Sequence, residues 1–493
     1  MDFTPIGHLK TVDAFKQNLR TLGLDLPCDD AVVSTVAGSP MGRPISVDGL
    51  TIGNRWCVHP MEGWDANADG TPSEHTLRRW QRFGQSGAKL IWGGEAFAVQ
   101  EDGRSNPRQS GIVAGDYGRG EQAAAVLLNR LKAAHWDRFG TTDGLVVGLQ
   151  LTHSGRYSVP HDTARREPVI AYHHAVLDRR CGIAPTDDSA IATDDYLYRL
   201  IESFIHVAKS AQRVGYDFVD VKACHGYLGH ELLSGYTRKG AFGGSFENRT
   251  RFLRLIIEGI QAQCPGLKIG VRLSAFDTVP YKPDPARSVG GKLGPGIPEE
   301  YPTPYPYGFG LNPNNPLEMD LTETIQLIHL LTKRSVKLIN VTAGSPYYCP
   351  HIQRPAIFPP SDGYQPPEDP LLAVCRQIEA TRQIKSACPA AILIGTGYTY
   401  LQDYLPHVAQ AVVRAGWTDL VGIGRMVLSY WDIIADALEG KPVTTHRVCR
   451  TFSDCTSAPR AGLISGCYPL DKTYKVMPEY EKLKAFKAAK AKS

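Results

Sequence analysis

Three titratable residues, Lys222, His225 and Tyr227, stand close together directly after the short apolar segment at residues 218–221. The segment has the character of a buried strand, and Gly226 allows a turn that brings neighbouring side chains together. Alone, each residue has an ordinary explanation as a surface charge, a hydrogen-bonded histidine or a core tyrosine. Their clustering at the end of a buried strand predicts an active site above a parallel barrel.

Short β-rich segments recur along the chain and alternate with segments of helical length. The clearest helical patterns lie at residues 196–214 and 249–263. The strands are expected at residues 51–58, 89–93, 145–151, 216–221, 268–274, 336–342, 391–394 and 419–423. Eight strands that alternate with helices predict an α/β fold, the (β/α)8 TIM barrel.

The remaining segments are expected around this barrel. Residues 1–45 form an N-terminal extension with a helix over residues 11–22, and residues 46–445 form the barrel. Two long insertions follow strand ends, at about residues 157–195 and 277–318. The second is rich in Pro, Gly and Tyr, and its aromatic residues favour an ordered lid over a disordered linker. Residues 446–493 form a C-terminal cap with cysteines and a basic tail.

Composition narrows the classes of function. The chain has 493 residues, of which 42% are hydrophobic and 21% charged, as expected of a globular protein with a large core. Its 54 basic and 50 acidic residues are too balanced to indicate a nucleic-acid or membrane partner. A signal peptide and an apolar run of membrane-spanning length are both absent, which predicts a cytoplasmic protein. Eleven cysteines, an odd number in a long chain, argue against a secreted disulfide framework.

Motifs at the ends of the expected strands resemble the old yellow enzyme family of FMN-dependent ene-reductases over roughly residues 45–445. GGSFENR at residues 243–249 is the most specific of them. The others are NRWCVHPME (54–62), GEA (94–96), QLTHSGR (150–156), VRLS (271–274), GTG (395–397) and GIGR (422–425). The resemblance implies FMN as the cofactor and NADH or NADPH as the hydride donor.

The resemblance also implies which residues contact FMN. Gln150 would bind the pyrimidine ring, and Arg272 would lie at the N1–C2=O edge, where a guanidinium stabilises the negative charge of the reduced flavin. The glycines after the last two strands and Arg425 would hold the phosphate. The full set is His59, Pro60, Met61, Glu62, Ala96, Gln150, Arg272, Gly395, Gly397, Gly424 and Arg425. No metal ligand is expected.

The catalytic residues depart from the family pattern at two positions. By resemblance, Lys222 and His225 hold the substrate carbonyl, and Tyr227 protonates Cα while hydride from flavin N5 adds to Cβ. Lys222 stands where the family usually has His, and Glu62 stands where it commonly has Thr or Cys. A carboxylate beside the ring would disfavour the reduced flavin, so we hypothesise that Lys222 pairs with Glu62 and compensates for it.

Three cysteines near the C-terminus raise the question of an iron–sulfur cluster. Bacterial dienoyl-CoA reductases, which resemble this family, carry C-x2-C-x3-C-x11-C after the barrel. Cys455 and Cys467 keep the last spacing, but Val448 and Thr451 occupy the first two positions and Cys449 is one residue off. Because four thiolates are normally required, a cluster is not expected. The chain is interpreted as a barrel-only relative of the dienoyl-CoA reductase branch.

The sequence therefore predicts an enzyme that transfers hydride from NAD(P)H through FMN to the activated C=C bond of a small molecule, such as an enone. Three alternatives stay open: oxidation of an amine or cyclic ketone, a Schiff-base lyase or aldolase that uses Lys222, and a non-catalytic flavin-binding protein. Barrels of this family commonly pair, so a homo-oligomer is a further prediction.

Overall fold

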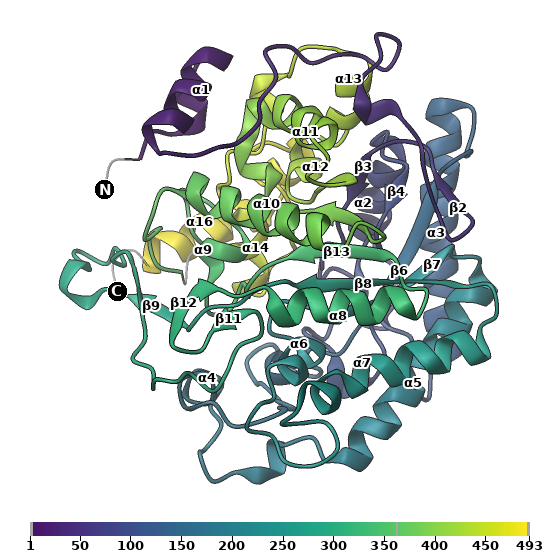
Figure 1. Ribbon diagram of the computed structural model, residues 1–493, viewed down its shortest axis with the longest axis vertical. Coiled ribbons are helices and arrows are strands. Elements are labelled where there is room, and N and C mark those ends of the chain that lie inside the picture. Colours follow the sequence, from purple (N-terminus) through teal and green to yellow (C-terminus); the bar gives the residue numbers. More distant parts are fainter. Residues whose placement is uncertain (1–2, 361–362, 491–493) are drawn as a thin grey trace.

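The computed structural model describes residues 3–360 and 363–490 and contains a closed parallel barrel (Figure 1). Its strands are β3 (Trp56–Val58), β4 (Leu90–Ile91), β6 (Val146–Thr152), β7 (Phe218–Ala223), β8 (Lys268–Ser274), β13 (Leu338–Thr342), β14 (Ile392–Gly395) and β15 (Leu420–Ile423). Pairing between β4 and β6 closes the ring. Each strand overlaps one of the eight expected segments, so the predicted (β/α)8 barrel is confirmed.

The first expected strand is wrong in its N-terminal part. Residues 51–52 belong instead to an antiparallel hairpin of β1 (Ile45–Val47) and β2 (Leu50–Ile52), with its turn at Asp48 and Gly49. Both turn residues have positive φ, 50° and 87°, which matches a tight hairpin. Val47 and Ile52 pack against the lower barrel core, which includes Trp92. The hairpin therefore closes the end of the barrel opposite the strand C-termini.

Helices surround the barrel, and the two that the sequence indicates most clearly are confirmed as α5 (Asp194–Val214) and α7 (Phe246–Gln263). Thr193 caps α5, and Gly215 ends it in the left-handed conformation. Other helices that cover the strands are α2 (Glu74–Gln85), α3 (Tyr117–Phe139), α8 (Thr322–Lys333), α10 (Pro370–Ala387) and α11 (Leu405–Arg414). Short helices at the strand ends are α6 (Leu228–Leu233), α9 (Pro350–Gln353), α12 (Met426–Ser429) and α13 (Ile433–Leu438).

The segments expected as insertions pack against each other. The first carries α4 (Ala175–Cys181), and the second carries two hairpins, β9 (Tyr281–Pro283) with β10 (Gly296–Pro298) and β11 (Leu311–Asn312) with β12 (Asn315–Met319). His174 Nε2 lies 2.9 Å from Tyr305 OH, and the rings of Tyr172 and Tyr307 stack at 5.4 Å. Aromatic residues of the second segment are thus part of an ordered structure.

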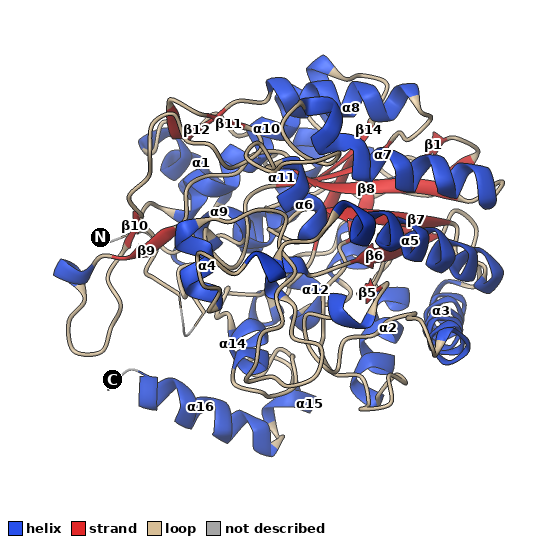
Figure 2. Ribbon diagram, turned by 90° about the horizontal axis from the view of Figure 1, so that it is seen from below, coloured by secondary structure: helices blue, strands red, loops and turns tan. Residues whose placement is uncertain are grey.

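The terminal segments lie on the outside of the barrel. The helix expected at residues 11–22 is α1 (Val12–Thr21), in which Phe15 stacks on Tyr404 at 4.4 Å. Near the C-terminus are α14 (Asp454–Arg460), α15 (Lys472–Lys475) and α16 (Pro478–Lys490), with α16 at the outer edge in Figure 2. Among the described residues, no helix combines the length and the apolar character needed to span a bilayer.

Candidate active site

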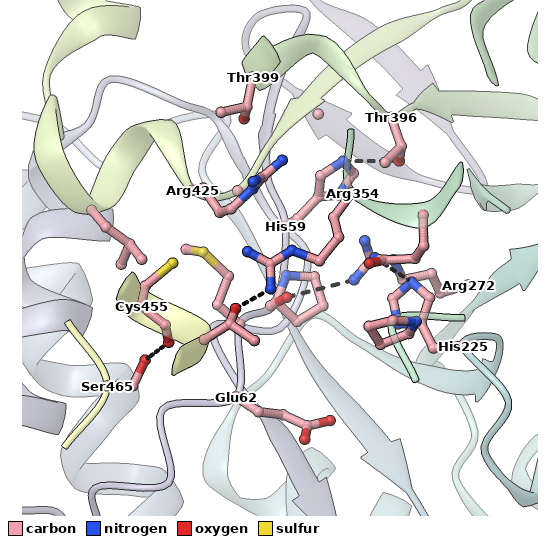
Figure 3. Close-up of a pocket in the computed structure, with 18 of the residues that line it drawn as sticks. His59, Glu62, His225, Arg272, Arg354, Thr396, Thr399, Arg425, Cys455 and Ser465 are labelled. Carbon is pink, nitrogen blue, oxygen red and sulfur yellow. Dashed lines mark hydrogen bonds between the residues drawn. The ribbon is translucent and has the colours of Figure 1, made fainter. Parts of the chain in front are cut away.

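A single cavity at the C-terminal ends of the barrel strands brings together most of the residues predicted for the site (Figure 3). It has about 1290 Å³ of empty space, part of which is open to solvent. Of the predicted residues, its lining includes His59, Pro60, Met61, Glu62, Gln150, Lys222, His225, Tyr227, Arg272, Gly397, Gly424 and Arg425. Lining residues that the sequence analysis missed include Trp64, Tyr347, Gln353, Arg354, Thr399, Thr456 and Ser465.

Two predicted residues, Ala96 and Gly395, lie behind this lining instead of in it. Ala96 is buried in β5 (Ala96–Ala98), whose pairing with β6 places it beside Gln150. Gly395 ends β14, and an added Cβ there would lie 2.9 Å from Tyr398 OH. Ala96 therefore lies beside a cavity residue, whereas the space around Gly395 is filled by Tyr398, which does not line the cavity.

Glu62 and Lys222 form a buried ion pair between the ends of β3 and β7. Lys222 Nζ lies 2.6 Å from Glu62 Oε1, and the two side chains are only 4% and 14% exposed. The second carboxylate oxygen, Oε2, accepts hydrogen bonds from Tyr227 OH at 2.8 Å, Ser105 Oγ at 2.9 Å and Trp64 Nε1 at 3.2 Å. Lys222 and Glu62 are therefore in direct contact, whereas the compensating effect on the flavin stays a hypothesis.

The charge state of Glu62 follows from these contacts. Burial alone raises the pKa of a carboxyl group, but the charge of Lys222 and the hydrogen bonds from Lys222, Tyr227 and Ser105 outweigh that effect. The pKa of Glu62 therefore lies below its ordinary value. A carboxylate is held beside Lys222 at neutral pH.

Tyr227 is fixed by contacts on three sides. Its hydroxyl bonds Glu62 and lies 3.1 Å from Tyr347 OH, and Lys222 Nζ lies 3.8 Å from the centre of its ring. Tyr347 in turn stacks on Tyr157 with ring centres 3.8 Å apart. Burial, with the charge of Glu62, raises the pKa of Tyr227 well above its ordinary value, so the phenol keeps its proton.

His225 reaches the cavity through a strained backbone. Its φ of 66° is unusual for a residue other than glycine, and Gly226 follows with φ of 78°. The backbone N–H of His225 donates to Ser274 Oγ at 3.0 Å and holds this turn. Its Nε2 lies 3.2 Å from Gln353 Nε2, and burial lowers the pKa of His225 far enough to keep the ring neutral. The expected convergence with Lys222 and Tyr227 thus uses two consecutive left-handed residues.

Gln150 and Arg272 lie on the barrel floor with a buried carboxyl between them. Gln150 Nε2 donates to Asp220 Oδ2 at 2.5 Å, and the backbone N–H of Arg272 donates to Asp220 Oδ1 at 2.7 Å. The amide oxygen of Gln150 is therefore left to accept an N–H from a ligand. Arg272 Nη1 has one long contact, 3.5 Å to Pro60 O, and its buried Nε has no partner among the described residues.

His59 is a support for the cavity floor. Its ring nitrogens lie 3.1 Å from Asn340 Nδ2 and 3.0 Å from Thr396 Oγ1. A Cβ added to Gly422 would come within 2.1 Å of the imidazole, so glycine is required there to accommodate His59. Burial lowers the pKa of His59 well below its ordinary value, and the ring is neutral.

At the other end of the cavity, glycines follow β14 and β15 beside Arg425. Gly397 has φ of 100°, a conformation that favours glycine. At Gly424 an added Cβ would meet nothing closer than Met61 Sδ at 3.6 Å, so internal packing does not demand glycine. Arg425 Nη2 donates to Pro355 O at 3.0 Å, while its buried Nη1 has no partner in the described part of the chain.

These features fit FMN. Arg272 and Arg425 both present buried guanidinium nitrogens that no described protein group satisfies, and such groups are normally satisfied in proteins. The cavity lining extends from the cluster at Tyr227 to Arg425, and Gly424 leaves room for a ligand to approach the backbone. The donor set suits a pyrimidine edge at Arg272 and Gln150 and a phosphate at Arg425.

The cysteine-containing segment contributes to the cavity wall. Cys455 lines the cavity, whereas the Cys449 backbone N–H contacts Met426 Sδ at 3.4 Å behind it. Within residues 3–360 and 363–490, no group of three or more His, Cys, Asp or Glu side chains is arranged to hold a metal ion. Arg354 reaches this segment and bonds Thr456 Oγ1.

The parallel barrel, the cavity and its donor set are the features expected of a flavin-dependent oxidoreductase. The family model described as "NADH:flavin oxidoreductase / NADH oxidase family" matches residues 40–286. The chain belongs to this family and is an oxidoreductase. The predicted family membership is thereby confirmed.

Relatives of known description support this assignment. An NADH:flavin oxidoreductase of Gibberella zeae is 25% identical over 409 residues, which are 80% of this chain and 84% of that protein. The NADPH dehydrogenase of Bacillus subtilis is 30% identical over 239 residues, 48% of this chain and 63% of that protein. Similarity to the second relative is therefore confined to part of each chain.

Solved structures share the fold. A complex of 2-naphthoyl-CoA reductase has a TM-score of 0.63 and 17% identity, covering 88% of this chain and 57% of that one. The old yellow enzyme homologue from Zymomonas mobilis has a TM-score of 0.54 and 20% identity, covering 84% and 96%.

Proposed function

We propose that the protein reduces the activated C=C bond of a small molecule, such as an enone, with FMN as cofactor and NADH or NADPH as hydride donor. The observation that carries this proposal is that Lys222, His225 and Tyr227 line one cavity. Gln150 and Arg272 line the same cavity. Bound FMN would supply the hydride-transfer chemistry between NAD(P)H and the substrate.

The chain's own residues divide the remaining work. Gln150 and Arg272 would hold the pyrimidine edge, and Arg425 the phosphate. Lys222 and the neutral imidazole of His225 would donate hydrogen bonds to the substrate carbonyl and stabilise negative charge that develops on its oxygen. Tyr227 would turn its O–H from Glu62 toward the substrate and give its proton to Cα.

The Lys222–Glu62 pair weighs against a Schiff-base lyase. Such an enzyme needs a neutral amine to attack a carbonyl, and neutral lysines arise where burial or a second cation destabilises the ammonium. Lys222 instead lies 2.6 Å from a carboxylate with a lowered pKa. An ion pair of this kind favours a hydrogen-bond donor over a nucleophile.

The same pair weighs against oxidation of an amine. A substrate ammonium would need a free carboxylate oxygen, and Glu62 is the natural candidate because it lines the cavity. Lys222 occupies its Oε1, and three further donors occupy its Oε2. Glu62 is therefore better suited to positioning Lys222 and Tyr227 than to binding a cationic substrate.

Rapid-reaction kinetics test the proposal. The purified protein should show a flavin spectrum that bleaches with NADPH or NADH under anaerobic conditions and recovers with 2-cyclohexenone. In Tyr227→Phe, recovery should slow by roughly 10²- to 10⁴-fold, the range for a lost general acid, while bleaching changes little. Equal loss in both half-reactions would reject the proton-donor role, and a colourless protein that cannot be loaded with FMN would reject the proposed function.

A further inference from the structure

Arg354 is a buried arginine of the cavity that no motif in the sequence indicates. It follows α9 in the loop after β13, and it is only 9% exposed. Its guanidinium bonds the hydroxyl of Thr456 and has a longer contact, 3.5 Å, with Ser453 Oγ. Both partners are neutral, so neither balances the positive charge.

Arg425 lies next to this guanidinium. Its Nη2 donates to the carbonyl of Pro355, the residue directly after Arg354, and its buried Nη1 has no partner among the described residues. Figure 3 shows both side chains reaching into the same part of the cavity. In the described part of the chain, no carboxylate pairs with either arginine, and Glu62 is already bound to Lys222.

Arg354 is buried and Arg425 is partly buried, and neither has a counter-ion among the described residues, which is unfavourable for two neighbouring cations. Burial and the charge of Arg425 lower the pKa of Arg354 to about 9. At that pKa, Arg354 is still charged at neutral pH. Taking a charge out of water is unfavourable unless an opposite charge accompanies it. An anion bound between the two guanidinium groups would remove this cost, and arginine forks match phosphate oxygens in bidentate geometry.

We propose that Arg354 is a second arginine ligand for the phosphate monoester of FMN, acting together with Arg425. The assignment rests on the proposed function, because it requires that FMN occupies the cavity. A phosphate dianion carries enough charge and enough acceptor oxygens for both guanidinium groups. Arg354 also ties the C-terminal segment at Thr456 to the cofactor end of the cavity, so that segment would be ordered by the same anion.

The test compares FMN with riboflavin, which lacks the phosphate. Flavin is removed from the full chain, and both flavins are titrated by fluorescence quenching. In Arg354→Met, which keeps the bulk of the side chain, the Kd for FMN should rise about 10- to 100-fold, the value of one or two hydrogen bonds to a charged group. The Kd for riboflavin should change less than about threefold. Arg354→Lys should recover part of the loss.

The matched control is Arg166→Met, which removes an exposed arginine whose guanidinium lies 5.7 Å from the ring centre of Tyr157. It should leave both affinities unchanged. Equal weakening of FMN and riboflavin in Arg354→Met would reduce Arg354 to a structural role and overturn the proposal. So would an unchanged Kd for FMN with a raised KM for NADPH alone, which would assign Arg354 to the nucleotide.

Two further measurements distinguish failure of the Arg354 assignment from misfolding of the variant and from failure of the proposed function. If Arg354→Met does not fold, Arg354→Lys should still release FMN from the holoenzyme faster than the wild type does, with riboflavin release unchanged. Identical FMN release would overturn the proposal. If the wild-type chain binds neither flavin, the proposed function fails instead, whatever Arg354 does.

Discussion

At one end of the cavity, Lys222 and Glu62 are 2.6 Å apart, and three further side chains donate hydrogen bonds to the same carboxylate. At the other end, Arg354 and Arg425 are adjacent and have only hydroxyl and carbonyl partners among the described residues. Both ends are buried and both contain cations. They differ in whether the protein supplies the counter-charge itself.

This difference separates two kinds of ligand. The end with the ion pair is electrically balanced before anything binds, which suits a neutral substrate that becomes negative only during reaction. The end with the arginines has no counter-charge from the described residues, which suits a group that is always an anion. A phosphate brings the missing charge with it, so its binding repays the burial of the arginines.

Of the variants considered, removal of Lys222 should have the largest effect on the stability of the fold. Lys222→Met leaves Glu62 buried without its cation, and unpaired charges of this kind destabilise proteins by about 4 kcal/mol. We expect a loss of that order in the free energy of unfolding, measured by urea denaturation of the flavin-free chain. The double variant Lys222→Met/Glu62→Gln removes both charges and should recover most of the loss. If the double variant is as unstable as Lys222→Met, the claim that Lys222 neutralises the charge of Glu62 is contradicted.

Asp220 is a buried carboxyl that can be compared with Glu62. It accepts hydrogen bonds but has no ion pair among the described residues. Burial raises its pKa from 3.8 to about 6, whereas the pKa of Glu62 is lowered. A raised pKa means that the folded state binds the proton more tightly than the unfolded state. Asp220 therefore stabilises the fold most below pH 3.8, and this contribution is lost as the pH rises through about 6.

Asp220→Asn removes this titration. Relative to the wild type, the stability of the variant should rise by about 3 kcal/mol between pH 3.5 and pH 8, since each pKa unit corresponds to about 1.4 kcal/mol. Urea unfolding at a series of pH values measures the difference. Glu62→Gln should show the opposite trend, because a lowered pKa stabilises the fold at higher pH. A flat difference for Asp220→Asn would mean that its pKa is not raised.

The fold was largely predictable because barrel strands are buried on both faces and appear as apolar runs. The error at residues 51–52 has a physical cause, since the β1–β2 hairpin and β3 are both apolar and only the turn at Asp48 and Gly49 separates their roles. Periodicity cannot reveal that one apolar run serves two structures.

The site was predictable where residues stand at strand ends within motifs. Lys222 and Glu62 lie 160 positions apart, yet their unusual types allowed their pairing to be hypothesised. Tyr347 and Arg354 were missed because they lie in the loop after β13, where no motif marks them. Their position after a barrel strand was the available signal. Their role depends on contacts with Tyr227 and Thr456 that only the folded chain brings about.

The reduction potential of the bound flavin should change when a charge is altered at the Lys222–Glu62 end of the cavity. It should hardly change when Arg354 is altered at the other end. Glu62→Gln leaves the charge of Lys222 uncompensated where the flavin ring is expected, and a cation there stabilises the reduced, anionic flavin. We expect the potential to rise by on the order of 30 mV, equivalent to about 1.4 kcal/mol for two electrons.

Lys222→Met should lower the potential by a similar amount, and the double variant should return it close to the wild-type value, because the pair acts as one neutral unit. Arg354→Met should shift it far less, since a phosphate contact lies outside the ring that changes charge. Spectroelectrochemical titration of the wild-type holoenzyme and the four variants measures all of these shifts. A larger shift in Arg354→Met than in Glu62→Gln would reverse the assignment of the two ends, placing the ring beside the arginines and the phosphate beside Lys222.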